Sequence, residues 1–241
     1  MLIDELLTYL FNQQLHPLAE PMAEWLASSR RFSTFVADFR AKIRKKLRST
    51  QEMEGMLDLR LELETAYLIL QERSLSLVYE PLPIGQSRGP DFSVTYTTST
   101  TFMLEVTRLR TVRDGTPDSI RSSVESRLAD IVCSKLGQLQ LQYGNILLVG
   151  VEGPRFTPDA LRTAMLQLQA RAERNDAAII QRHGFRDRAD FFGHFHRLSE
   201  LLLCGPRLQS GEPVIGWVNP QAKHPLPGKV RNALYHSLKV S

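Results

Sequence analysis

The chain of 241 residues has little of what disulfide frameworks, cysteine metal centres or membrane spans require. Cysteine occurs only at Cys133 and Cys204, without a Cys-x-x-Cys pair, which excludes a disulfide framework and a cysteine zinc site. We expect both to be small buried hydrophobes. No apolar run approaches the roughly 20 residues that a membrane-spanning helix needs. The sequence shows no internal repeat, no glycine-rich nucleotide loop and no basic leader, so we expect a cytoplasmic protein outside the nucleotide-loop enzymes.

What the chain does contain is typical of one α/β domain with a helical extension. Hydrophobic residues make up 42% and charged residues 23%, as in ordinary globular proteins. Residues 1–50 lack glycine and read as helices, so we expect an N-terminal helical extension there and an α/β domain over 51–241. Within that domain the periodicity predicts helices at 51–71, 117–142, 158–174 and 230–238, and strands at 75–79, 91–96, 101–107, 145–151, 198–204 and 213–219. The sheet should be mixed, a hairpin joined to parallel strands.

The expected hairpin brings two distant acids together. If its turn centres on Thr98, antiparallel partners sum to 196 and Asp91 lies opposite Glu105. Opposed residues have Cβ atoms roughly 4.5 to 5.5 Å apart, so two carboxylates there repel each other and call for a cation. Hard oxygen ligands favour Mg²⁺. The alternative is an exposed acid pair, or a register shifted by one residue.

The flanking helices offer further polar groups. Glu64 interrupts the apolar stripe of the first helix, which makes it a better metal ligand than Glu62, although a glutamate at the core edge stays open. After the hairpin, the stripe of the next helix continues onto Lys135 and Gln138, so both should face the sheet. A lysine there has an electrostatic reason to approach two carboxylates, and the alternative is a lysine extending past the core edge.

The formal charge of +4 and pI near 9.2 are weak indicators of a nucleic-acid ligand. The clustering of that charge says more, because residues 40–48 hold six basic side chains in nine positions. This segment is either a solvated helix face or a phosphate-contacting patch. The candidates for nucleic-acid contact are Lys42, Arg44, Lys45 and Lys46.

Taken together, Pro90-Asp91, Glu105-Val106-Thr107, a preceding helical glutamate and a following helix with Lys135 and Gln138 form a known pattern. Over residues 55–151 the sequence resembles the PD-(D/E)XK nuclease superfamily. The resemblance implies a restriction endonuclease-like αβββαβ core, here with two extra C-terminal strands. It also implies metal binding by Asp91, Glu105 and the Val106 carbonyl, with Glu64 as the helix acid.

One position departs from the pattern, because Thr107 stands where the superfamily has a lysine. A threonine hydroxyl cannot place a positive charge beside a phosphate, so Lys135 would take that role and Gln138 would orient water or phosphate. The resulting hypothesis is a Mg²⁺- or Mn²⁺-dependent nuclease acting on nucleic acid, DNA ahead of RNA, with a homodimer left open. The rival hypothesis is an inactive module of the same fold that binds nucleic acid or a protein partner.

Overall fold

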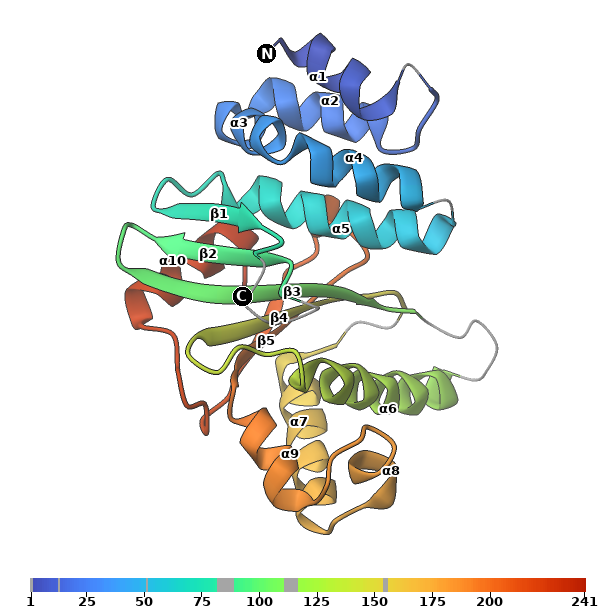
Figure 1. Ribbon diagram of the computed structural model, residues 1–241. Coiled ribbons are helices and arrows are strands. Elements are labelled where there is room, and N and C mark those ends of the chain that lie inside the picture. The colour runs from blue at the N-terminus through green and yellow to red at the C-terminus, as the bar shows by residue number, and fades with distance from the viewer. Residues whose placement is uncertain (1, 13, 51, 82–88, 111–116, 154–155) are drawn as a thin grey trace.

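The computed structural model describes the chain except residues 1, 13, 51, 82–88, 111–116 and 154–155, and gives only the backbone of 117–123. The described part forms one open sheet of six strands with helices on both faces (Figure 1). The strands are β1 (Leu75–Tyr79), β2 (Phe92–Tyr96), β3 (Thr100–Leu109), β4 (Gly144–Val151), β5 (Leu198–Cys204) and β6 (Ile215–Val218). The helices are α1 (Ile3–Phe11), α2 (Ala19–Ser28), α3 (Arg30–Asp38), α4 (Arg40–Ser49), α5 (Met53–Ile69), α6 (Pro117–Leu136), α7 (Pro158–Glu173), α8 (Ala177–Ile180), α9 (Arg188–Phe195) and α10 (Gly228–Leu238), with a 3-10 turn, η1, at Leu208–Ser210.

The strands lie in chain order across the sheet, and the sheet is mixed as expected. β1, β2 and β3 pair antiparallel, β3, β4 and β5 pair parallel, and β6 returns antiparallel. The expected hairpin register is confirmed, since Phe92 pairs with Leu104 and Tyr96 with Thr100. Continuing that register by one residue places Asp91, which immediately precedes β2, opposite Glu105 of β3.

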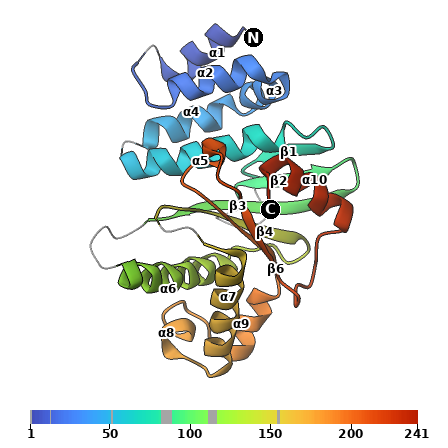
Figure 2. The same ribbon diagram turned by 180° about the vertical axis from the view of Figure 1, so that it is seen from behind.

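Two hydrophobic clusters fill the two faces of the sheet. Helices α1 to α5 and α10 pack on one face, and α6 to α9 pack on the other (Figures 1 and 2). Strand alternation divides the side chains between them: Ile146 and Leu148 of β4 point to the first cluster, and Leu147 and Val149 to the second. β4 and β5 are therefore buried along their whole length, as the nearly continuous apolar sequence of β4 indicates for that strand.

Helix α5 lies between the N-terminal helices and the sheet (Figure 1). Side chains on several of its sides are consequently buried, including Leu59, Leu61, Leu63 and Ile69. Met53, the first residue of the helix, is apolar but exposed. A single-stripe analysis fails for a helix covered on two sides, because apolar positions then follow no one face.

Helix α6 ends at Leu136, six residues before the expected end. The chain turns there, with Gln138 N–H bonded to the Lys135 carbonyl. The buried side chain of Asn145 at the start of β4 fixes this turn, since it binds the backbone of Gln140 and Tyr143. Gln138 thus lies in a turn and not on the helix.

Both cysteines are buried and reduced, as the sequence predicted. Thr157 accepts a hydrogen bond from Ala160 N–H and caps α7. Among the described residues, no helix is long and apolar enough to cross a membrane.

Candidate active site

Asp91 and Glu105 are held at one end of the sheet, where β2 begins and β3 continues past it. Asp91 Oδ2 accepts a hydrogen bond of 2.8 Å from Val106 N–H, a group that the β2 ladder no longer reaches. The N–H and C=O of one strand residue point to the same side, so the Val106 carbonyl also faces the Asp91 side of β3. Glu105 lies on β3 with its side chain only 8% exposed.

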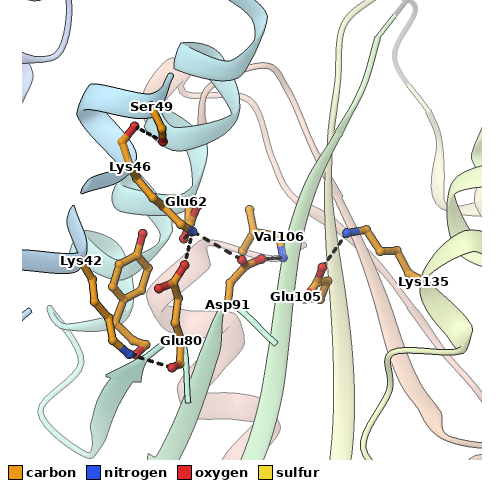
Figure 3. A network of polar contacts seen from close by, with 10 residues as sticks. Lys42, Lys46, Ser49, Glu62, Glu80, Asp91, Glu105, Val106 and Lys135 are labelled. Carbon is orange, nitrogen blue, oxygen red and sulfur yellow. Dashed lines mark hydrogen bonds and ion pairs between the residues drawn. The ribbon is translucent and has the colours of Figure 1, made fainter. Parts of the chain in front are cut away.

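Lys135 reaches the site from α6, as its place on the apolar stripe predicts. Its Nζ lies 2.6 Å from Glu105 Oε1 (Figure 3). Glu105 is thus paired with a cation on the α6 face of the sheet. Thr107, two residues on along β3, is half-buried and supplies no charge.

A second lysine reaches the site from the opposite side. Lys46 of α4 places its Nζ 2.6 Å from Glu62 Oε1, 2.9 Å from Glu80 Oε1 and 4.0 Å from Asp91 Oδ1. In Figure 3, Lys46 and Lys135 approach from opposite sides of β3, with Asp91 and Glu105 between them. The N-terminal helices therefore contribute a residue to the site.

Glu80 is fixed in an unusual conformation at the end of β1. Its φ of 43° lies in the left-handed region, which non-glycine residues adopt rarely. Lys42 Nζ donates a hydrogen bond of 2.8 Å to the Glu80 carbonyl. The backbone N–H of Glu80 donates to the Asp91 carbonyl at 2.7 Å. These contacts hold the Glu80 carboxylate toward Lys46.

The carboxylates of the site affect each other's ionisation. Burial raises the pKa of Asp91 well above its usual value, and Glu62 and Glu105 raise it further, while Val106 N–H and Lys46 oppose them. Burial also raises the pKa of Glu62, against the attraction of Lys46. For Lys46, burial is the largest single influence and acts to lower the pKa, but the charges of Glu62 and Asp91 and the hydrogen bonds to Glu62 and Glu80 together outweigh it, so the pKa is raised. The lysine therefore stays protonated, whereas burial and the neighbouring acids favour the neutral form of Asp91.

Of the two helix acids, the structure places Glu62 beside Lys46 and Asp91, whereas Glu64 lies elsewhere. Glu64 is fully buried and accepts hydrogen bonds from Leu208 N–H and Gln209 N–H, so it anchors η1 to α5. The side of α5 that carries Glu62 faces Lys46 of α4. The basic segment of α4, which contains its partner Lys46, is the sequence signal that could have identified Glu62.

Gln138 and the basic segment are placed differently from the sequence expectation. The turn after α6 carries Gln138 off the helix, and no described hydrogen bond joins its side chain to the carboxylates. Lys42 and Lys46 point into the fold, and Arg44 stacks 4.4 Å from the centre of the Tyr9 ring. Lys45 alone among the four predicted nucleic-acid contacts is exposed. Among the described residues, Lys46 is thus the member of this segment that pairs with acids, while Arg40, Lys45 and Arg48 are exposed.

The donors fit Mg²⁺ in kind, since carboxylate and carbonyl oxygens are its preferred ligands. The positions of these donors, however, do not form a metal site among the described residues. Within the described residues, no three acidic, histidine or cysteine side chains are gathered closely enough to hold a metal ion. Asp91 and Glu105 are instead held by Val106 N–H and by ammonium groups. Uptake of a cation would require these side chains to shift.

Comparison of the chain with protein-family models, with curated proteins and with solved structures gives no match.

Proposed function

We propose that the protein is a metal-dependent nuclease that hydrolyses phosphodiester bonds of nucleic acid in the cytoplasm, DNA ahead of RNA. The observation that carries the proposal is the contact of Lys135 with Glu105, 2.6 Å long, beside Asp91 at the same sheet end. This lysine is the cation that the motif lacks at Thr107. Two carboxylates, a strand carbonyl and a nearby ammonium are the groups that such hydrolysis uses.

The topology supports a restriction endonuclease-like core. Residues 53–151 run in the order helix, three antiparallel strands, helix and parallel strand, from α5 to β4. This is the αβββαβ order that the sequence resemblance implies. The helices before α5 and the strands after β4 are additions to that core.

The charges of the site support a divalent cation. The carboxylates of Glu62, Glu80, Asp91 and Glu105 outnumber the two ammonium groups that pair with them, those of Lys46 and Lys135. Asp91, Glu105 and the Val106 carbonyl would hold Mg²⁺ or Mn²⁺, which lowers the pKa of a bound water and polarises the phosphodiester. Lys135 would offset the negative charge that builds on the phosphate.

The rival function is a non-catalytic module of the same fold. It is favoured by one observation, that Lys46 and Lys135 already neutralise part of the acid cluster without a metal. Fold alone cannot choose between the two, because chemistry resides in the site.

Calorimetric titration with Mn²⁺ and a cleavage assay on single- and double-stranded DNA and RNA test the proposal. Wild type should bind Mn²⁺ and cleave at least one substrate, and Asp91→Asn should abolish both. Lys135→Met should lower kcat by about 100-fold, the effect of one electrostatic donor in a transition state. Lys229→Met, an exposed lysine on α10, is the matched control and should behave as wild type.

A compensating variant separates the role of Lys135 from its packing. Thr107 shares a face with Glu105, so Lys135→Met/Thr107→Lys returns an ammonium to the same acids from the strand. Recovery of at least a tenth of the wild-type kcat is expected. Absence of Mn²⁺ binding and of cleavage in wild type would overturn the proposal in favour of the rival.

A further inference from the structure

A pocket of about 510 Å³ lies in the N-terminal helical layer, where three helix ends meet. It is lined by the C-terminal ends of α1 and α4, the connection from α1 to α2 and the first turn of α5. These segments lie together at one end of the layer (Figures 1 and 2). The described residues that line it take no part in the acid cluster at the sheet end. Its volume falls within the range of about 300 to 1,000 Å³ that is typical of small-molecule sites.

Much of the pocket wall is apolar. Four apolar side chains from three helices contribute to it, those of Leu10, Phe11, Leu47 and Met56. Exposed apolar side chains continue this surface, since Leu15 lies between two lining residues in the chain and Met53 lies one turn before Met56 on α5. The pocket therefore offers apolar surface to the body of a ligand.

The charge of the pocket is positive. Arg48 of α4 contributes to the lining and is exposed, and among the described residues it makes no ion pair. His16 adds no second charge, because its Nδ1 accepts a hydrogen bond of 3.1 Å from Leu18 N–H and burial lowers its pKa. The described lining contains no acidic side chain. An anionic group on a ligand would thus meet an unpaired guanidinium.

The helix ends around the pocket do not compete for that guanidinium. The Thr8 carbonyl accepts a hydrogen bond of 2.8 Å from Asn12 N–H, and the Lys46 carbonyl accepts one of 3.0 Å from Thr50 N–H. The side chains of Asn12 and Gln14 also bring amide N–H donors to the lining. A carboxylate beside Arg48 would find donors as well as charge.

We infer that this pocket binds a small monocarboxylate with an aliphatic body, whose carboxylate pairs with Arg48 and whose body lies against the apolar wall. The inference goes beyond the proposed function and does not depend on it. A guanidinium binds a carboxylate in a bidentate manner, which matches the single cation of the lining. A nucleobase fits less well, because Phe11 is buried and packs on His16 with ring centres 5.1 Å apart, so it offers no open face for stacking.

Calorimetric titration with octanoate and octanamide tests the inference, because the two ligands share an aliphatic body and differ in charge. Wild type should bind octanoate with a Kd below about 1 mM and octanamide about 10-fold more weakly. Arg48→Met should weaken octanoate binding about 10-fold and leave octanamide binding unchanged, since it removes the cation and keeps an apolar stem. Lys45→Met replaces an exposed lysine of the same helix outside the pocket lining and should behave as wild type.

Two further measurements test the apolar wall. Butanoate should bind wild type at least about 10-fold more weakly than octanoate, because each buried methylene contributes about 4-fold. Met56→Trp places a larger side chain at the pocket and should weaken both eight-carbon ligands at least about 10-fold. If Met56→Trp does not fold, butanoate still tests the wall and Arg48→Met still tests the charge.

Several results would overturn the inference. These are absence of octanoate binding by wild type, equal binding of octanamide or butanoate, an Arg48→Met variant that matches Lys45→Met, or a folded Met56→Trp variant that binds as wild type. A single-stranded oligonucleotide that wild type binds and Arg48→Met does not, with octanoate unbound, would assign the pocket to nucleic acid and also overturn it. None of these measurements requires cleavage of nucleic acid, so this inference and the proposed function can fail separately.

Discussion

Replacing Arg231 by methionine should destabilise the protein strongly, because it leaves a charge buried in the sheet. Glu200 of β5 is fully buried, and its two oxygens are bound by Arg231 Nε at 2.6 Å and Tyr235 Oη at 2.8 Å. Removing one partner of a buried ion pair costs about 3 to 5 kcal/mol. The Arg231 side chain is 28% exposed, so water can reach part of the gap and the lower value, about 3 kcal/mol, is expected.

Thermal and urea unfolding of Arg231→Met measure this cost. For a chain of this size, about 3 kcal/mol corresponds to a fall in Tm of about 6 to 12 °C. Glu200→Gln/Arg231→Met removes the charge together with its partner and keeps an acceptor for Tyr235, so it should recover most of the loss. A loss below about 1 kcal/mol in the single variant, or a double variant no better than the single, would refute the reasoning. Lys229→Met on the same helix is the control.

Three further changes test the site and its support. Because burial and neighbouring acids raise the pKa of Asp91 above 3.8, its contribution to stability falls as pH rises through the folded pKa. Asp91→Asn, which keeps the acceptor for Val106 N–H, should thus exceed wild-type stability by about 1 kcal/mol at neutral pH, and the gain should shrink toward pH 3.8; a constant gain in thermal unfolding across pH argues against this. Gly150→Ala places a Cβ 2.7 Å from the Leu61 side chain and should cost about 1 to 3 kcal/mol in urea unfolding, whereas an unchanged midpoint would mean that α5 yields readily. Thr157→Ala removes the α7 cap at a cost of about 1 kcal/mol, and restoration by Thr157→Ser checks that the hydroxyl is responsible.

The sequence predicted those parts of the site that depend on one or two neighbouring elements. The register that brings Asp91 to Glu105 follows from a short turn and strand alternation, which are local. The approach of Lys135 follows from the stripe of one helix. Glu62 could not be chosen over Glu64 in the same way, because α5 is buried on two sides and its pattern has no single direction.

The contacts made by the N-terminal helices could not be predicted from the sequence, for a related reason. Lys46 and Glu62 are 16 positions apart on different helices, and their meeting depends on how α4 crosses α5. A basic run was interpreted as a surface because charged residues are usually solvated. In this fold two lysines of that run turn inward, Lys42 to strand carbonyls and Lys46 to carboxylates.

The need for a cation between Asp91 and Glu105 was inferred from repulsion alone, and the structure meets part of that need from within the chain. One ammonium arrives from each face of the sheet, that of Lys46 near Asp91 and that of Lys135 at Glu105. Two charges on separate helices can respond to a ligand separately, which a single strand lysine cannot do. Lys135 contacts one carboxylate, whereas Lys46 is shared among three. The division of charge is therefore the physical reason to expect that replacing the two lysines would have different consequences for cation binding.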